Sequence, residues 1–283
     1  MTFTNKINED QMVDILNAVY SKALDGIPKV SRSIESLASD YIERNESPEK
    51  AARQLINYQI AKCGTSGFLT GLGGLITLPV TLPANVSSVL YIQLRMIAAI
   101  AHIGGFDTRS DQVQTMVYAC LTGSAIADVL KQTGIKVGQK ITINAIKNIP
   151  GKVLTSVNQK VGFRLITKFG ETGIINLGKM VPVVGGVVGG TVDIGSTKII
   201  AENAYSIFIK RQVPEEPKHI KASEVSDTVK KGIEELGDTV GSASDKIKRR
   251  IEDAGNKLPQ VKLPDVKIPK IQLSKKKKDE ENE

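Results

Sequence analysis

Two ionisable side chains stand alone in apolar stretches of this sequence and are its first candidates for chemistry. Arg95 lies in a predicted apolar helix, and Asp193 follows 12 uncharged residues that begin at Val181. Removing a charge from water is costly unless a partner compensates for it. We therefore expect Arg95 and Asp193 to form a buried ion pair between two glycine-rich helices, with ligand binding as the alternative. A further alternative is an enzyme of unknown type, which would need His102 and Asp107 in one cleft with Arg95 and Asp193.

The chain offers few other groups for catalysis or metal binding. It contains two histidines and two cysteines, which is too few for a disulfide scaffold and leaves little for a zinc site. Gly71, Gly73 and Gly74 suggest a phosphate loop, but no strand is predicted before them and no lysine follows within twenty residues. We expect no metal site, no cofactor and no catalytic residues, which favours a non-enzymatic protein.

Positive charge is concentrated in the middle of the chain. Residues 63–214 hold 14 basic and six acidic groups, whereas the segments on either side are nearly balanced. Residues 129–170, called the basic region below, contain no acidic residue. Such a field attracts lipid headgroups, nucleic acid or an acidic protein, and an ordinary solvated surface is the alternative. The candidate anion- or lipid-binding residues are Lys131, Lys136, Lys140, Lys147, Lys152, Lys160, Arg164 and Lys168.

Nucleic acid is the least favoured of these partners. Single-stranded nucleic acid is normally bound by aromatic side chains that stack on its bases. Only Phe163 and Phe169 offer such rings within the basic region. Anionic membrane lipid, met at the surface or within one leaflet, is therefore the expected partner.

The elements that must position these side chains are predicted to be helices. Apolar residues recur at intervals of three and four along the first half of the chain. Residues 135–170, interrupted by Gly134 and by Pro150-Gly151, are expected to form short helices. The fold class is therefore all-α. The longer predicted helices cover residues 9–25, about 28–41, 48–62, 84–102 and 111–133.

An apolar hairpin is predicted at the centre of this helical domain. Residues 63–94 carry no charge, and their 32 residues exceed the roughly 20 that span a bilayer. Pro79 and Pro83 interrupt the run, and a mid-membrane Arg95 would cost at least about 2.5 kcal/mol. We expect a hairpin over residues 63–103 that is buried in the protein core. Insertion into one leaflet is the alternative, and full spanning is the least favoured hypothesis.

A second glycine-rich segment contains Asp193. Gly185 and Gly189 are four residues apart, as are Gly186 and Gly190. On a helix this spacing makes a ridge of small residues that allows another helix to approach closely. We expect tight helix packing within the domain.

The composition divides the chain into three parts. A helical domain is expected over residues 1–213, because the sequence PEEP begins at Pro214. Residues 214–258 show a narrow apolar stripe at helical spacing, which predicts an amphipathic helix that needs a partner or a membrane for stability. Residues 259–283 carry a proline every five positions and then a charged end, which predicts a disordered tail or a segment that docks on a protein partner.

Two blocks of this sequence resemble the signature blocks of the bacterial EcsC family. The first is GFLTGLGGLITLPVTLPANVSSVLYIQLRMIAAIAHIGGFD at 67–107, and the second is MVPVVGGVVGGTVDIGSTKIIAENAY at 180–205. Asn85 departs from the acidic residue that many members carry after the LPA element. The matching positions are Gly71, Gly73, Gly74, Pro79, Pro83, Arg95, Gly105, Asp107, Pro182, Gly185, Gly186, Gly190 and Asp193.

This resemblance implies a mostly helical protein that is cytoplasmic or associated with a membrane, and it implies no reaction. Together with the basic region, it leads us to expect a non-enzymatic protein at the inner face of the cell membrane. The hairpin and the basic lysines would make the contact. The polar, acidic first residues lack the pattern of a secretory signal. A soluble cytoplasmic scaffold or regulator with a buried apolar core is the main alternative.

Overall fold

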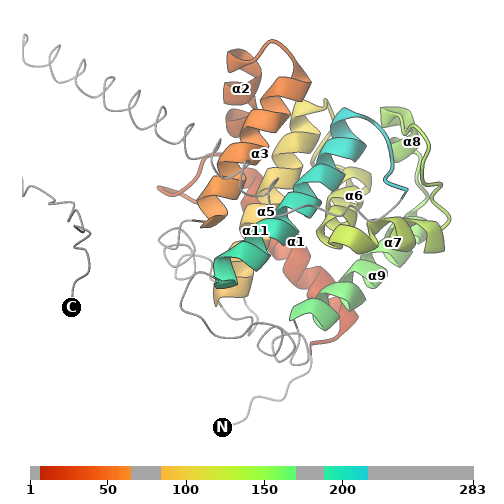
Figure 1. The fold of residues 1–283 in the computed structure, drawn as a ribbon. Coiled ribbons are helices and arrows are strands. Elements are labelled where there is room, and N and C mark those ends of the chain that lie inside the picture. Colours follow the sequence, from red (N-terminus) through yellow and green to blue (C-terminus); the bar gives the residue numbers. More distant parts are fainter. Residues whose placement is uncertain (1–6, 65–83, 170–187, 216–283) are drawn as a thin grey trace, which may run out of the picture. The chain divides into compact units, whose positions relative to one another are not determined.

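The structure, a computed structural model, describes residues 7–64, 84–169 and 188–215, excluding the side chains of 61–64, 84–88, 168–169 and 188–195. These residues form helices joined by turns, without a β-strand among them (Figure 1). The all-α expectation is confirmed. The helices are α1 (Glu9–Asp25), α2 (Ile34–Arg44), α3 (Pro48–Gly64), α5 (Ala84–Ile103), α6 (Asp111–Leu121), α7 (Ile126–Gln132), α8 (Ile143–Lys147), α9 (Gly151–Phe169) and α11 (Val188–Ala204).

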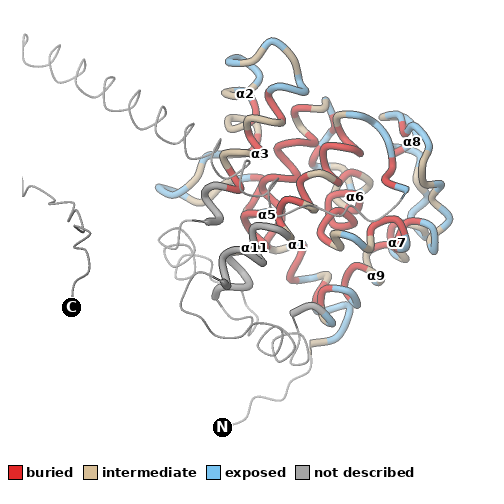
Figure 2. Tube along the Cα trace, viewed as in Figure 1, coloured by how far each residue is buried: buried red, intermediate tan, exposed pale blue. Residues whose placement is uncertain are grey.

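Helix α5 is the centre of the bundle. It packs against α1, α2, α3, α6 and α11, and every residue from Leu90 to Ala101 is buried. Figure 2 shows this helix as a buried segment enclosed by the others. A helix that is apolar on nearly all sides gains most from such a position. The second arm of the predicted hairpin is therefore core, while residues 65–83 of the first arm lie outside the described residues.

Helix α1 has the limits that its sequence predicts. Asn8 and Gln11 form a capping box, and the apolar face from Met12 to Leu24 is buried. The helix ends at Gly26, whose φ of 82° is unfavourable for other residues. A Cβ there would lie 2.4 Å from the Ser31 carbonyl oxygen.

The second helix starts later than the sequence indicates. Ile27 and Ser31 pair through their backbones, so the chain turns before it can become helical. The Ser33 hydroxyl then caps α2 by accepting a hydrogen bond from the Ser36 amide. The predicted start near Pro28 is therefore wrong.

The predicted single helix over residues 111–133 is also wrong. Helix α6 ends at Leu121, a 3₁₀ turn covers Gly123–Ala125, and α7 leaves at an angle of 120°. The Gly123 carbonyl accepts the Ile126 amide within the 3₁₀ turn and also a hydrogen bond from the Asn203 side chain at 2.7 Å. A tertiary contact from α11 thus stabilises a break that the apolar spacing conceals.

The basic region forms the last part of the domain before the second undescribed internal segment. It holds the short helix α8 and then α9, which at 19 residues is longer than the short helices expected. Helix α11 continues into a π-helical turn at Tyr205–Ile209. After that turn the chain returns to the loop before α8, where Lys140 and Gln212 form an antiparallel bridge.

Candidate functional site

Arg95 is a buried cation that faces helix α1. Its side chain is 7% exposed, and Nη1 donates a hydrogen bond to the Ala23 carbonyl oxygen at 3.0 Å. Burial lowers the pKa of Arg95 from its ordinary value, and the neighbouring Tyr91 hydroxyl partly opposes that change. Arginine stays protonated even after such a shift, because its pKa in water is above 12. Arg95 therefore acts as a hydrogen-bond donor between helices.

The Arg95 site extends through a chain of hydroxyl groups. The hydroxyls of Tyr91 and Ser31 are 2.5 Å apart, and Ser31 Oγ also accepts a hydrogen bond from the Ile27 amide at 2.9 Å. These contacts connect α5 to the turn between α1 and α2. Buried polar groups that are satisfied in this way fix the relative position of the elements that carry them.

The predicted Arg95–Asp193 ion pair stays a prediction, because the Asp193 side chain lies outside the described side chains. Helix α5 contacts α11 through Gln93, whose Nε2 donates to Thr197 Oγ1 at 3.0 Å. Residues two apart on a helix point to nearly opposite sides. Arg95 thus lies on the side of α5 away from this α11 contact.

Three of the four residues of the enzyme hypothesis, Arg95, His102 and Asp107, have described side chains, whereas Asp193 does not. Asp107 Oδ1 accepts a hydrogen bond from the Arg109 amide at 3.0 Å, which stabilises the turn after α5. His102 lies two helical turns beyond Arg95, or about 10 Å along α5. Among the described residues, no group of three or more His, Cys, Asp or Glu is placed to hold a metal ion.

The basic region presents its charge to solvent. Of the eight predicted anion-binding residues, six are exposed, Lys160 is half-buried, and Lys168 lies outside the described side chains. Helices α7, α8 and α9 lie on one side of the bundle in Figure 1, and their outer segments are exposed in Figure 2. Lys160 Nζ donates to Gln132 Oε1 at 3.0 Å, which joins the exposed surfaces of α9 and α7.

One exposed strip of α9 combines cations with an aromatic ring. We call it the α9 face and define it by Lys152, Lys160, Phe163 and Arg164. Phe163 is 53% exposed and is the most exposed large hydrophobic side chain of the described residues. It borders a shallow hollow of about 310 Å³ together with Lys160, Arg164 and the acidic Glu9.

The opposite side of α9 explains this exposure. Val157, Val161 and Leu165 are buried, and a Cβ at Gly162 would lie 2.9 Å from the Glu9 carbonyl oxygen. Helix α9 therefore rests closely on the start of α1. The side of α9 that carries Phe163 therefore faces solvent among the described residues.

Comparison with known proteins fixes the family. A model of the EcsC protein family matches residues 5–213, which is most of the chain. This chain belongs to the EcsC family. No significant match was found among curated proteins or among solved structures.

The positions of the EcsC motif divide between described and undescribed residues. Gly105 has a φ of 80° and ends α5, and Asp107 forms the turn that follows. Gly190 and Asp193 lie within α11, without described side chains. The other motif positions lie outside the described residues: Gly71, Gly73, Gly74, Pro79, Pro83, Pro182, Gly185 and Gly186.

No described helix of this EcsC domain has both the length and the apolar composition to cross a bilayer by itself. The α6 and α7 segments meet those two criteria only when they are taken together across their 120° bend.

Two features of the EcsC domain cannot be predicted from the distribution of charge in the sequence. The exposure of Phe163 follows from helical spacing, since it shares a side of α9 with Lys152 and Lys160 and lies opposite Val161. Arg53 on α3 pairs with Glu202 on α11 and lies 3.7 Å from the centre of the Tyr205 ring. No local pattern links these three residues, because 149 positions separate Arg53 from Glu202.

Proposed function

We propose that this EcsC protein is a non-enzymatic protein that binds the anionic inner surface of the cell membrane through the α9 face and the lysines around it. The observation that supports it most directly is the exposed Phe163 between Lys160 and Arg164. An aromatic or aliphatic side chain enters the headgroup layer while neighbouring cations pair with anionic lipids. The buried arm of the hairpin, α5, takes no part.

The expected attraction follows from the charge of the region. Each Lys or Arg near an anionic membrane contributes about 1 kcal/mol, and the effect falls off within a Debye length. Six basic side chains of the region are exposed, and residues 129–170 contain no acidic residue to oppose them. Glu9 borders the α9 face and reduces the attraction locally. Binding should therefore depend strongly on salt.

Phe163 supplies an apolar contribution. Complete burial of a Phe side chain contributes about 1.5–3 kcal/mol, and partial insertion from a half-exposed position contributes less. A single aromatic ring cannot hold a protein on a neutral bilayer at that energy, so the cations and the ring must act together. Neutral vesicles should bind weakly.

The test is sedimentation of the full chain with vesicles of phosphatidylglycerol and phosphatidylcholine, compared with phosphatidylcholine alone. We expect binding to the anionic vesicles that falls as salt is raised from 50 to 500 mM. Lys152→Glu with Arg164→Glu should reduce binding at least tenfold. Arg44→Glu with Lys50→Glu makes the same change in net charge on exposed residues away from the α9 face, and it should reduce binding much less.

Phe163→Ala, with Ile42→Ala as its control, tests the aromatic contribution. Ile42 is 45% exposed and has Glu43 as a neighbour in α2. We expect weaker vesicle binding for Phe163→Ala alone. Equal binding of both vesicle types, or equal loss in both charge variants, would contradict the proposal.

A soluble scaffold is the second candidate function, and the burial of α5 favours it. The apolar run that suggested a membrane hairpin is core along its described second arm. Full solubility with no binding to anionic vesicles at low salt would support this scaffold.

A further inference from the structure

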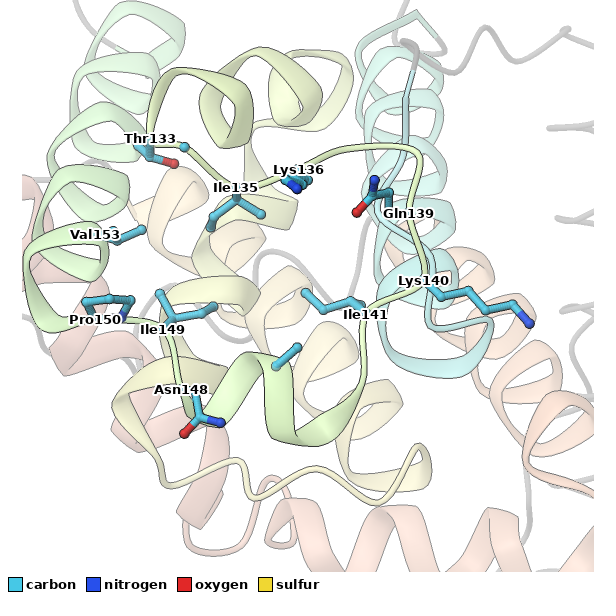
Figure 3. A pocket seen from close by; sticks show the side chains of 12 residues that line it. Thr133, Ile135, Lys136, Gln139, Lys140, Ile141, Asn148, Ile149, Pro150 and Val153 are labelled. Carbon is cyan, nitrogen blue, oxygen red and sulfur yellow. The ribbon is translucent and has the colours of Figure 1, made fainter.

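A second hollow lies beside the basic loop and differs from the α9 face in its lining. It has a volume of about 300 Å³ and lies between residues 133–141, α8 and the start of α9. In Figure 3, Ile135, Ile141, Ile149 and Val153 reach toward its middle. Aliphatic side chains therefore form part of its lining, together with the polar Thr133, Gln139 and Asn148, and no aromatic residue lines it.

The rim of this hollow is polar and positively charged. Lys136 and Lys140 both line it and are exposed, and no acidic residue is part of the lining. Figure 3 shows Lys136 at the rim next to Ile135, whereas Lys140 extends outward. The Glu215 carboxylate lies beside Gly138, in the same loop that carries Lys136 and Lys140. An anion at Lys136 would be attracted by the two lysines, and Glu215 would offset part of that attraction.

Backbone hydrogen bonds hold the loop that borders the hollow in place. The Gly138 amide donates to the Val213 carbonyl at 3.0 Å, and the Ile141 amide donates to the Arg211 carbonyl at 2.7 Å. Gly138 has a φ of 74°, which allows the loop to curve over the aliphatic side chains. A binding site that is formed before its ligand arrives avoids the cost of ordering the loop.

We propose that this hollow binds a single-chain anionic lipid, with the alkyl chain against the aliphatic side chains and the phosphate or carboxylate head at Lys136. The aliphatic lining fits a flexible chain and offers no ring on which a nucleobase could stack. A volume of about 300 Å³ is at the lower end of small-molecule sites, which suits one chain. This inference does not rest on the membrane proposal, because it concerns a monomeric ligand in a hollow that Phe163 does not line.

The test is isothermal titration of the full chain with decyl phosphate below its critical micelle concentration. We expect saturable binding with one site. Inorganic phosphate and uncharged decyl maltoside should each bind at least tenfold more weakly, since each lacks one of the two interactions. A tenfold change corresponds to about 1.4 kcal/mol.

Matched variants locate the site. Lys136→Glu should weaken decyl phosphate binding at least tenfold, whereas Lys131→Glu, with the same change in charge on exposed α7, should change it less than twofold. Ala145→Phe should also weaken binding, because Ala145 is exposed and lines the hollow. Circular dichroism and thermal unfolding of each variant check that the fold is kept.

Four results would overturn the proposal. They are absence of binding, equal binding of inorganic phosphate, equal binding of decyl maltoside, and equal effects of Lys136→Glu and Lys131→Glu. Equal binding of decyl maltoside would indicate an uncharged occupant. Equal effects of the two lysine variants would indicate attraction by the overall charge of the surface and not by Lys136. None of them bears on vesicle binding through Phe163, so the two proposals can fail separately.

Discussion

Nη1 of Arg95 lies 3.0 Å from the carbonyl oxygen of Ala23, so the central helix α5 is bonded to the last turn of α1. The same guanidinium group lies beside Tyr91, whose hydroxyl contacts Ser31 in the next turn of the chain. Arg95 and Tyr91 together therefore connect α5 to the end of α1 and to the turn that follows it.

Arg95→Ala should lower the free energy of unfolding by about 2–4 kcal/mol, because it leaves a cavity and an unpaired buried carbonyl. Urea denaturation measures the change. Arg109→Ala is the control: Arg109 is exposed and pairs with Asp25 and Glu35, so its loss should cost less than about 1 kcal/mol. Similar losses in the two variants would show that Arg95 is not a structural tie.

Two glycines with nearly the same backbone angle should respond differently to alanine. Gly26 and Gly105 have φ values of 82° and 80°, so both variants incur a conformational cost of about 1–2 kcal/mol. Only at Gly26 would the new Cβ clash, at 2.4 Å from the Ser31 carbonyl oxygen, whereas nothing lies within 4 Å at Gly105. Gly26→Ala should therefore lower the melting temperature clearly more than Gly105→Ala, and equal shifts would contradict the described turn.

Arg53→Lys should destabilise the protein by about 1 kcal/mol although it keeps the charge. Arg53 bonds both carboxylate oxygens of Glu202, one of them at 3.1 Å, and it stacks on Tyr205. Lysine has neither the fork nor the flat surface for these contacts. Lys50→Ala, which removes an exposed pair with Glu46, should change the urea midpoint much less.

Stability should fall at alkaline pH because two tyrosines are buried. Burial raises the pKa of Tyr20 and of Tyr118 above the ordinary value of 10.0. Each stays neutral in the folded protein but ionises in the unfolded chain near pH 10, so the unfolded state then binds fewer protons. The stability present below pH 10 is lost as the pH rises above it, by about 1.4 kcal/mol per pH unit for each tyrosine.

Tyr20→Phe checks this dependence. The variant loses the hydrogen bond from Tyr20 to the Thr108 carbonyl at 2.7 Å, so it should be less stable at pH 8. Its unfolding free energy should nevertheless fall less steeply between pH 10 and 11. An unchanged slope would mean that Tyr20 ionises alike in both states.

The sequence predicts the helices well where local signals and burial agree. Helix α1 has a capping box, an apolar face and a terminal glycine, and its limits follow from these alone. The break after Leu121 combines a local feature, the φ of 60° at Gly123, with a distant one, the hydrogen bond that Asn203 donates to the Gly123 carbonyl from 80 positions away. Periodic spacing continues through that break, so the sequence around it indicates one helix.

The candidate surfaces also differ in whether local sequence or a distant contact determines them. The absence of acidic residues from 129–170 predicts exposed lysines, and helical spacing places Phe163 among them. The aliphatic hollow cannot be predicted in this way. Its loop is held by Arg211 and Val213, about seventy residues further along the chain, and that pairing involves backbone atoms that no side-chain pattern encodes.

This backbone pairing also has a mechanical consequence. Gln139 accepts a hydrogen bond from Val213 at 3.2 Å, beside the bonds that Gly138 and Ile141 make to the same returning segment. The chain continues from there toward residue 283. Force applied to that downstream chain acts first on these few backbone hydrogen bonds, so it would open the loop around Lys136 before the helices unfold.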